Sequence, residues 1–430
     1  MKNLYQIKWL LFFVILGANA QQEKGIIGST NWLANWTEFK PAAVEYNEST
    51  EILYNKITTN TTLYKRTTYL LQGPVYVTNG ATLTIEAGTV IKGDFETNGA
   101  LIITRGSKII ADGSETDPIV FTSNRPQKKA GDWCGVVILG DAPINKFGGT
   151  SALSYDLDQG STMYGGNTPL SDSGIFRFVR IEFAGKKIKG FKDFSSLTIA
   201  GVGSKTIIDN VMCSFANNNS FEILGGDLNL NRLVTLKSNG DDFKFSQGTQ
   251  CRIDNSLAIR DSYYSTSVRS RCLNVASYDN KREEADFSRK LSNVVVSNFT
   301  MVNNSKTFTE DLAQGLVKEA VFVNPNTELT IKKSVISGFK PAIILDDEIA
   351  IETNNLAKLK LSQIYFNNCK GNIFSENTTN NEDLENHYGD PGFFNLYENV
   401  PNDQTFLNVK GPKDFDFRIK IGKFAASTSK

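Results

Sequence analysis

Short runs of alternating apolar and polar residues fill most of the chain, and one run recurs at a nearly constant interval. Its copies stand at residues 208–212, 230–234 and 253–257, which gives a repeat of roughly 22 residues, a period typical of solenoids. A second series of apolar runs lies between these copies, at 221–224 and 243–245. Each period therefore holds more than one strand, and no apolar run has helical spacing. The pattern predicts an all-β fold, a parallel β-helix.

The strand pattern predicts one continuous coil over residues 73–380. A Gly- and Ser-rich stretch at about 145–173 interrupts this coil and is expected to project as a loop insertion. Residues 21–72 lack the repeat and are expected to form an atypical N-terminal cap, because the end of a solenoid exposes an unpaired sheet edge. Residues 381–430 are expected to form a terminal coil and a polar tail.

The repeat also predicts which residues are buried and which form corners. Apolar residues at equivalent positions should stack in the core, namely Val211, Leu233, Leu257 and Val294. Asn residues at equivalent positions should stack their amides at a turn, namely Asn210, Asn255 and Asn293. Trp32 and Trp36 are interpreted as the core of the N-terminal cap rather than as a platform for a ligand.

The first twenty residues have the order of a secretory signal peptide. Lys2 and Lys8 precede an apolar run at 9–18 that is too short to span a bilayer, and a small-x-small cleavage site follows at 18–20. The mature chain is expected to begin near Gln21 and to reach the periplasm, the outer-membrane surface or the medium. No later segment has 18 or more apolar residues, so no transmembrane segment is expected after signal cleavage.

Charge and cysteine content exclude some classes of protein. Lys+Arg and Asp+Glu number 46 each, so no electrostatic footprint for nucleic acid is present and nucleic acid is not an expected partner. The five cysteines lack the spacing of a zinc site. Cys251 and Cys272 lie about one coil apart, which leaves a disulfide between them open. The alternative is that most of the cysteines are small buried hydrophobic residues.

Three segments together resemble one family. Residues 80–89 read GATLTIEAGT, residues 131–140 read GDWCGVVILG, and residues 164–185 begin with YGG and end with VRIEFAG. They are similar to segments of the exported right-handed β-helix proteins of Bacteroidota, and the similarity covers about residues 59–261. The resemblance implies a right-handed parallel β-helix in the cell envelope or outside the cell. It implies no established reaction.

The strongest candidates for chemistry are acidic residues on neighbouring coils, namely Asp241, Asp242, Glu222 and Asp227. Two carboxylates so placed could serve as acid and base in glycoside hydrolysis, or Asp241 and Asp242 could hold Ca²⁺ against a uronic acid. The alternative is a solvated turn in which the Asp side chains cap backbone N–H groups. In that case, changing Asp241 and Asp242 to Asn should alter only stability, by about 0.5–2 kcal/mol by analogy with helix N-caps.

Asp241 and Asp242 also resemble the paired Asp of the polygalacturonase family, and Arg418 stands in a similar Arg-Ile-Lys motif. At the place of that family's His-containing loop, however, this chain has Arg260. The single histidine, His387, lies in the polar C-terminal stretch without a recognisable catalytic partner. The catalytic constellation of that family is therefore incomplete here.

Two classes of function follow from these observations. The favoured one is a non-catalytic, exported binding or structural protein of the bacterial cell envelope, whose β-helix surface meets a cell-surface or environmental glycan or an outer-membrane protein partner. The alternative is a polysaccharide lyase or glycoside hydrolase that uses the acidic cluster. No cofactor other than calcium is indicated for either class.

Overall fold

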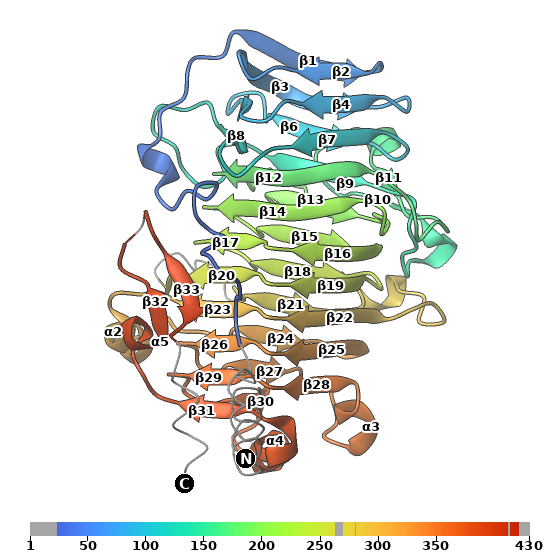
Figure 1. Cartoon of the computed structure of the whole chain (residues 1–430). Helices are drawn as coiled ribbons and strands as arrows, with labels where there is room; N and C mark the ends of the chain where they lie inside the picture. Colours follow the sequence, from blue (N-terminus) through green and yellow to red (C-terminus); the bar gives the residue numbers. More distant parts are fainter. Residues whose placement is uncertain (1–23, 263–269, 280, 412, 421–430) are drawn as a thin grey trace, which may run out of the picture.

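The computed structural model describes residues 24–262, 270–279, 281–411 and 413–420. In this part of the chain, 29 strands join one continuous sheet that winds into a right-handed parallel β-helix (Figure 1). The predicted fold class is therefore confirmed. No helix within the described ranges is long and apolar enough to cross a membrane. The predicted signal peptide lies outside the described residues.

The coil has three faces, here called faces 1, 2 and 3. Face 1 consists of β2 (Thr61–Leu63), β4 (Thr82–Ile85), β7 (Lys108–Asp112), β16 (Asp227–Asn231), β19 (Gln250–Asp254), β22 (Ser292–Ser297), β25 (Thr327–Lys332) and β28 (Leu359–Ser362). Face 2 consists of β5 (Val90–Gly93), β8 (Ile119–Ser123), β17 (Val234–Leu236), β20 (Leu257–Arg260), β23 (Thr300–Asn303), β26 (Val335–Ser337), β29 (Tyr365–Asn367) and β31 (Leu396–Glu398). Face 3 consists of β6 (Ala100–Ile103), β9 (Gly135–Leu139), β13 (Leu197–Ala200), β15 (Phe221–Leu224), β18 (Phe243–Ser246), β21 (Leu273–Val275), β24 (Val321–Val323), β27 (Ile343–Leu345) and β30 (Ile373–Ser375).

Four longer strands bend round a corner and contribute to two faces. They are β1 (Glu51–Ile57) and β3 (Thr68–Val77), which join faces 2 and 3, and β12 (Gly174–Glu182) and β14 (Ile207–Ser214), which join faces 1 and 2. The α-helices within the described ranges are short, namely α2 (Phe308–Ala313), α3 (Thr353–Leu356), α4 (Glu382–Gly389) and α5 (Asn402–Thr405). The 3₁₀-helices of the same ranges are Pro41–Ala43, Phe147–Gly149, Gln159–Ser161, Arg282–Glu284 and Pro391–Phe393. Two small antiparallel pairs complete the fold, namely β10 (Ser151–Ala152) with β11 (Met163–Tyr164), and β32 (Phe406–Asn408) with β33 (Asp416–Ile419).

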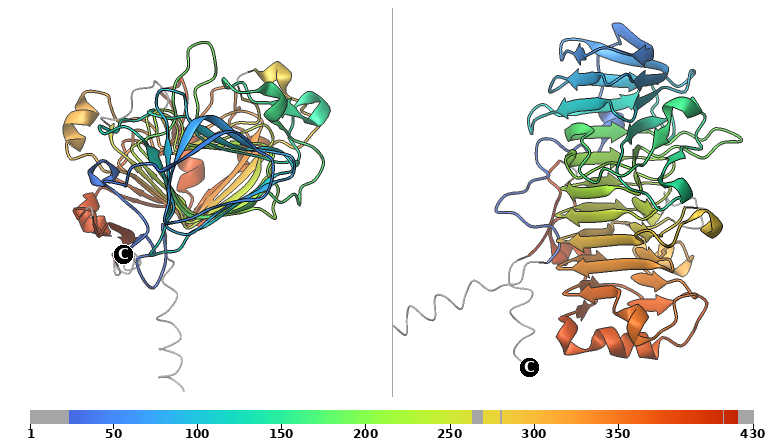
Figure 2. Two further views of the ribbon diagram at one scale, coloured as in Figure 1. Left: turned by 90° about the horizontal axis from the view of Figure 1, so that it is seen from above. Right: turned by 90° about the vertical axis from the view of Figure 1, so that its right-hand side faces the viewer.

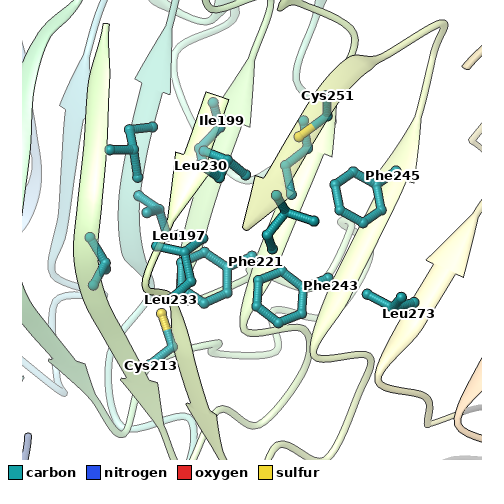
Figure 3. Packing of buried hydrophobic residues seen from close by; sticks show 14 of the residues in the cluster. Leu197, Ile199, Cys213, Phe221, Leu230, Leu233, Phe243, Phe245, Cys251 and Leu273 are labelled. Atoms are coloured by element: carbon teal, nitrogen blue, oxygen red, sulfur yellow. The ribbon is translucent and has the colours of Figure 1, made fainter. Parts of the chain in front are cut away.

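The repeated segments of the sequence are neighbouring strands of successive turns of the coil, paired in register. Ile208 pairs with Leu230, and Leu230 pairs with Ile253, so the three copies stack on one another in face 1. On face 3, Phe221 pairs with Phe243, and their rings stack with centroids 4.8 Å apart (Figure 3). Because parallel strands stack about 4.8 Å apart, equivalent side chains of successive coils are in contact throughout the core.

The predicted core register is right for Val211 and Leu233 but wrong for Leu257. All of the predicted core residues are buried, and Val294 lies on face 1. Leu257, however, pairs with Val234, so its side chain points out of the coil rather than into it. The inward position belongs to Ser256, whose hydroxyl accepts a hydrogen bond from the Leu233 amide at 2.9 Å. A hydrogen-bonded serine thus fills a place where the pattern predicted a leucine.

The corner between faces 1 and 2 is made by residues in the left-handed conformation. Asn210, Arg232, Asn255 and Asn298 occupy it with φ between 46° and 50°. Asn adopts this conformation more readily than most residues, which explains its recurrence. Asn210 and Asn255 are therefore corner residues as predicted, but Arg232 separates them, so their amides do not form a ladder. The prediction for Asn293 is wrong, because Asn293 lies inside β22 and pairs with Gln250.

Residues 24–50, here called the strap, run lengthwise along the outside of the coil instead of winding round it (Figure 1). Successive strap residues bond to successively earlier coils: the amide of Gly25 donates to the Lys333 carbonyl, that of Ile26 to Thr300 Oγ1 and that of Ile27 to Asn255 Oδ1. Further along, the Tyr46 hydroxyl accepts a hydrogen bond from Arg180 in β12. The strap begins beside the C-terminal coils and ends at β1, so it is not the end cap that was predicted for residues 21–72.

The strap covers an apolar stripe on the outer surface of face 2. The stripe consists of the outward-facing residues Met212, Val234, Leu236, Leu257, Ile259, Val302, Val335 and Tyr365. Trp36 is completely buried against this surface, and its ring meets Phe178 edge-on at 5.9 Å. Trp32 stacks on Trp36 at 6.3 Å. Trp36 is therefore a packing residue, as predicted, although it belongs to the strap and not to a cap.

The two ends of the coil differ from the predicted boundaries. Strands β1 to β3 belong to the coil, which therefore begins at Glu51. At the other end β31 pairs with β29, and α4 covers the last coils through the buried Leu384 and Tyr388. The hairpin β32–β33 lies beside the strap, where Arg418 donates a hydrogen bond to the Gly28 carbonyl.

The cysteines are free thiols. Cys251 lies in β19 on face 1 and stacks between Leu228 and Val294. Cys272 precedes β21 on face 3. The two residues are therefore on different faces of the coil, and the disulfide considered from their spacing does not form. The alternative, that most cysteines are buried as small hydrophobic residues, is confirmed for all but the half-buried Cys369.

Candidate functional site

Three of the four predicted carboxylates lie at face 3. Glu222 is in β15, and Asp241 and Asp242 come immediately before β18 in the next coil. Asp227 instead begins β16 on face 1, after a turn made by the glycines at 225–226. The structure thus brings Glu222 and Asp241 to one face and places Asp227 on another.

Glu222 points outward from face 3, because its neighbours Phe221 and Ile223 fill the core. An outward side chain on a β-helix is normally exposed, but Glu222 is completely buried. Loops that follow β9, β12 and β21 project on one side of the coil (Figure 2) and carry the residues that cover it. The carboxylate therefore lies between the sheet and these loops.

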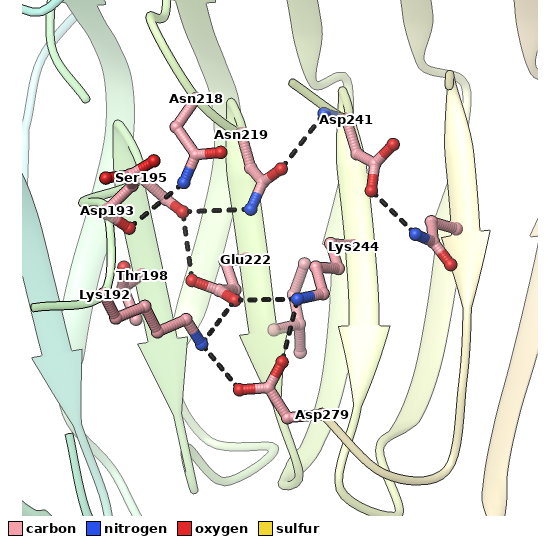
Figure 4. A network of polar contacts seen from close by, with 12 residues as sticks. Lys192, Asp193, Ser195, Thr198, Asn218, Asn219, Glu222, Asp241, Lys244 and Asp279 are labelled. Atoms are coloured by element: carbon pink, nitrogen blue, oxygen red, sulfur yellow. Dashed lines mark hydrogen bonds and ion pairs between the residues drawn. The ribbon is translucent and has the colours of Figure 1, made fainter. Parts of the chain in front are cut away.

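Glu222 and three other charged side chains, Lys192, Lys244 and Asp279, form a closed set, here called the ion ring (Figure 4). Lys192 Nζ lies 2.9 Å from Glu222 Oε1 and 2.7 Å from Asp279 Oδ2. Lys244 Nζ lies 3.6 Å from Glu222 Oε1 and 2.8 Å from Asp279 Oδ1. Each lysine contacts both carboxylates, so two positive and two negative charges balance at a largely buried site.

Neutral groups complete the surroundings of Glu222. The hydroxyls of Tyr155 and Ser195 donate hydrogen bonds to Glu222 Oε2 at 2.8 Å and 3.0 Å. Tyr155 comes from the insertion at 145–173, Lys192 and Ser195 from the loop after β12, and Asp279 from the loop after β21. The ion ring and these hydroxyl groups together fasten three separate loops to face 3.

The ion pairs determine the protonation states of the four side chains in the ion ring. Burial acts to raise the pKa of Glu222, but Lys192 and Lys244 outweigh burial and lower it. The pKa of Asp279 is also lowered, because the same two lysines outweigh its burial. The carboxylates in turn raise the pKa of both lysines above their usual range in spite of burial. A general acid usually needs a raised pKa, whereas the pKa of Glu222 is lowered.

Asp241 is a buried cap of the backbone. Its Oδ1 accepts a hydrogen bond from the amide of Arg271 at 3.0 Å, and its Oδ2 accepts one from Asn274 Nδ2 at 2.8 Å. Burial raises the pKa of this carboxyl. The predicted capping of a backbone N–H group is present, but the side chain is buried and not solvated as expected.

Asp242 has a different role from the solvated turn that the sequence predicted. Its side chain is completely buried, and its Oδ2 accepts a hydrogen bond from Arg260 Nη1 at 3.0 Å. The Arg260 guanidinium also donates to the carbonyls of Gly240 and Ser238. Burial raises the pKa of Asp242, and Arg260 opposes this effect. Asp242 and Arg260 thus form an interior ion pair that holds the turn.

These contacts limit the chemistry of the acidic residues. Asp241 and Asp242 are adjacent in sequence but bind different partners, so their carboxylates do not converge on a common point. Throughout the described ranges, no group of three or more His, Cys, Asp or Glu residues is placed to hold a metal ion. The calcium and catalytic roles of Asp241, Asp242, Glu222 and Asp227 stay predictions. The contacts present are those of structural residues.

Sequence reasoning did not identify the other members of the ion ring. Lys244 could have been found, because it follows Glu222 by one period and pairs with it in the next strand. Lys192 and Asp279 lie in loops of irregular length, and no pattern marks them. His387 and Arg418, also considered from the sequence, lie in α4 and β33 near the C-terminal end.

Changing Asp241 to Asn is expected to lower the free energy of unfolding by only about 1 kcal/mol. The amide oxygen can still accept the hydrogen bond from the Arg271 amide, while the bond from Asn274 weakens. Equilibrium unfolding in urea measures this change. A loss above about 3 kcal/mol would contradict the capping role, because it would mean that the charge itself is required.

Comparison with known proteins agrees with the geometry of the coil. A family model described as a pectate-lyase-like beta helix domain matches residues 55–391. The chain therefore belongs to this family of pectate-lyase-like β-helix domains. No curated protein matches the chain. Among solved structures, full-length tailspike protein 2 from Escherichia coli O157:H7 bacteriophage CAB120 is similar, with 12% sequence identity and a TM-score of 0.25. The match covers 78% of this chain and 38% of the tailspike chain, so this chain corresponds to less than half of that protein.

Proposed function

We propose that this protein is a non-catalytic, exported glycan-binding protein of the bacterial cell envelope, and that the loop after β12 carries its binding surface. The observation that supports this proposal is the composition and anchoring of residues 186–191. They read Lys-Lys-Ile-Lys-Gly-Phe, and the next residue, Lys192, is fixed in the ion ring. Lys187, Lys189 and Phe191 thus stand exposed beside a residue that is held in the ion ring, while Lys186 donates a hydrogen bond to the Phe95 carbonyl.

The exposed part of this loop suits an acidic polysaccharide. Lys187 and Lys189 are exposed, and Phe191 keeps 48% of its surface accessible. Lys187 lies 3.6 Å from Asp193, an exposed ion pair that a competing carboxylate can replace at little cost. An aromatic ring can pack against the apolar C–H face of a sugar, while neighbouring cations pair with the carboxylate of an acidic sugar.

The candidate acids support a binding role more than a catalytic one. Glu222 is paired with two lysines, Asp242 is paired with Arg260, and Asp241 caps a backbone amide. Each is buried, so a polymer on the outside of the loops does not reach them. The alternative function, a polysaccharide lyase or glycoside hydrolase, would require the loops that cover face 3 to open. Export and envelope location rest on the signal-like N-terminus.

Changing both Lys187 and Lys189 to Gln is expected to weaken binding to polygalacturonate about tenfold, since each exposed charge contributes up to about 1 kcal/mol. Affinity electrophoresis at two salt concentrations measures both the loss and its salt dependence. The matched control changes Lys332 and Lys360, two exposed lysines of face 1, to Gln and should leave binding unchanged.

The same experiment separates the two functions. Equal losses in the loop variant and in the face 1 variant would place the binding surface elsewhere. Chain cleavage by the wild-type protein, with or without Ca²⁺, that disappears when Glu222 is changed to Gln would favour the enzyme. Stable co-purification with an outer-membrane protein that the loop variant loses would replace the glycan by a protein partner.

A further inference from the structure

A second buried carboxylate, Glu182, lies beneath the strap and has a very different environment from Glu222. Glu182 ends β12, and because Ile181 fills the core, the Glu182 side chain points outward on face 2. Only 1% of its surface is accessible. The strap passes over this position, with Tyr46 bonded to Arg180, two residues before Glu182.

The polar atoms at this position are poorly satisfied. Within the described part of the chain, neither carboxylate oxygen of Glu182 has a hydrogen-bond partner, and the same holds for Arg180 Nε and Thr122 Oγ1. Arg180 Nε lies 3.4 Å from Glu182 Oε1, close enough for attraction. Thr122 of β8 lies close enough to favour the ionised form of Glu182. A buried carboxylate without a well-formed hydrogen bond to either oxygen is uncommon in folded proteins.

The charged groups around Glu182 come from every element packed there. Arg180 belongs to β12, and Lys128 follows β8 and donates a hydrogen bond from Nζ to the Val44 carbonyl of the strap at 3.2 Å. Glu38 and Tyr46 belong to the strap itself. Repulsion from the Glu38 carboxylate disfavours the ionised form of Glu182 and so raises its pKa. Lys92, further along face 2, lies 3.9 Å from Glu48 of the strap. The arrangement gives Glu182 no dedicated counter-ion, because Arg180 is shared with Tyr46.

We propose that ionisation of Glu182 loosens the strap where it crosses β12, so that the strap acts as a pH-dependent cover of the apolar stripe. When Glu182 is neutral, it is buried at little cost and Arg180 holds Tyr46. When Glu182 is ionised, its charge is stabilised by water, which reaches it only if the strap lifts. Lifting of the strap would expose Met212 and its neighbours in the stripe.

The direction of the effect follows from the two states of the carboxyl group. Burial raises the pKa of Glu182 from 4.5 to about 7, while the group would titrate near its ordinary value once the strap is open. Because the raised pKa belongs to the closed state, the contribution to closure is fully present below pH 4.5 and is lost as the pH rises through about 7. The ratio of open to closed strap should therefore increase by about two orders of magnitude over this interval.

Hydrogen exchange in the full-length protein tests the proposal. The Glu38 amide, which donates to Met212 Sδ, and its neighbours at 36–46 report on the strap. After correction for intrinsic exchange, their protection should fall at least tenfold between pH 5.5 and pH 8.5. In Glu182→Gln, protection should be the same at both pH values. Exchange in the strands of face 1 should not change in either protein.

Two further variants keep the test decisive. Lys128→Gln retains a donor for the Val44 carbonyl but removes a charge that favours ionised Glu182, so the midpoint should move to higher pH. Asp209→Asn changes a half-buried carboxyl of β14 whose pKa burial also raises, and it should leave the strap transition unaltered. Equal wild-type protection at both pH values, or a transition that persists in Glu182→Gln and ignores Lys128→Gln, would overturn the proposal.

Discussion

Replacing Glu222 with Ala is expected to lower the free energy of unfolding by about 3–5 kcal/mol. The change leaves Lys192 and Lys244 facing each other with Asp279 as their only shared anion, in a site from which water is largely excluded. Breaking a buried ion pair is costly because the remaining charge is neither paired nor solvated. Urea-induced unfolding followed by circular dichroism measures the loss.

The control for this prediction is Glu328→Ala. Glu328 is an exposed carboxylate of β25 that bonds to Asn293, and its removal should change stability by no more than about 0.5 kcal/mol. Replacing Glu222 and Lys244 together by Leu should recover part of the loss, because apolar residues can substitute for a buried ion pair. A Glu222→Ala protein as stable as the wild type would show that the ring does not anchor the loops.

The largest loss of stability is expected from Leu233→Asp, at more than 4 kcal/mol. Leu233 is completely buried inside the coil, where an aspartate would lie among apolar side chains. Neighbouring coils share the same core, so the penalty should also lower the stability of the adjacent repeats. Thermal unfolding and the yield of soluble protein both report this effect.

Ile207→Asp is the matched control for the core prediction. Ile207 begins β14, and 44% of its surface is accessible on the outside of face 1. The same substitution there should cost less than about 1 kcal/mol. Similar melting temperatures for the two variants would mean that the register of the coil is wrong.

The architecture could be predicted from the sequence because each coil buries apolar residues at equivalent positions, so the same pattern recurs along the chain. Leu230 and Ile253 recur at the interval of one turn, and their pairing is the one that the spacing predicted. The error at Leu257 arose because the pattern counts apolar residues alone. Ser256 satisfies its hydroxyl by donating to the Asp254 carbonyl at 2.8 Å, so a polar residue can occupy the inward position.

The site was less predictable because its parts come from loops whose lengths follow no repeat. Asp279 is 57 residues beyond Glu222, and Tyr155 is 67 residues before it. Only Lys244, in the strand next to Glu222, follows the periodicity. The sequence correctly suggested that Glu222 and Asp241 lie at neighbouring coils, but the cations that neutralise Glu222 could not be identified without the path of the loops. The same limit applies to the strap, whose partners are distributed over the whole length of the coil.

The course of the strap also imposes an order on folding. Ile26 bonds to a residue 274 positions later, and Gly28 bonds to one 390 positions later. At a synthesis rate of about 5–20 residues per second, the first strap residues would wait roughly 20–80 seconds before Arg418 exists. The coil can grow from neighbouring repeats during this interval, but the strap can cover each part of the apolar stripe only after the strands of that part have been made. Newly made molecules therefore pass through a stage in which part of the apolar stripe is exposed, and a holding chaperone should bind them at this stage.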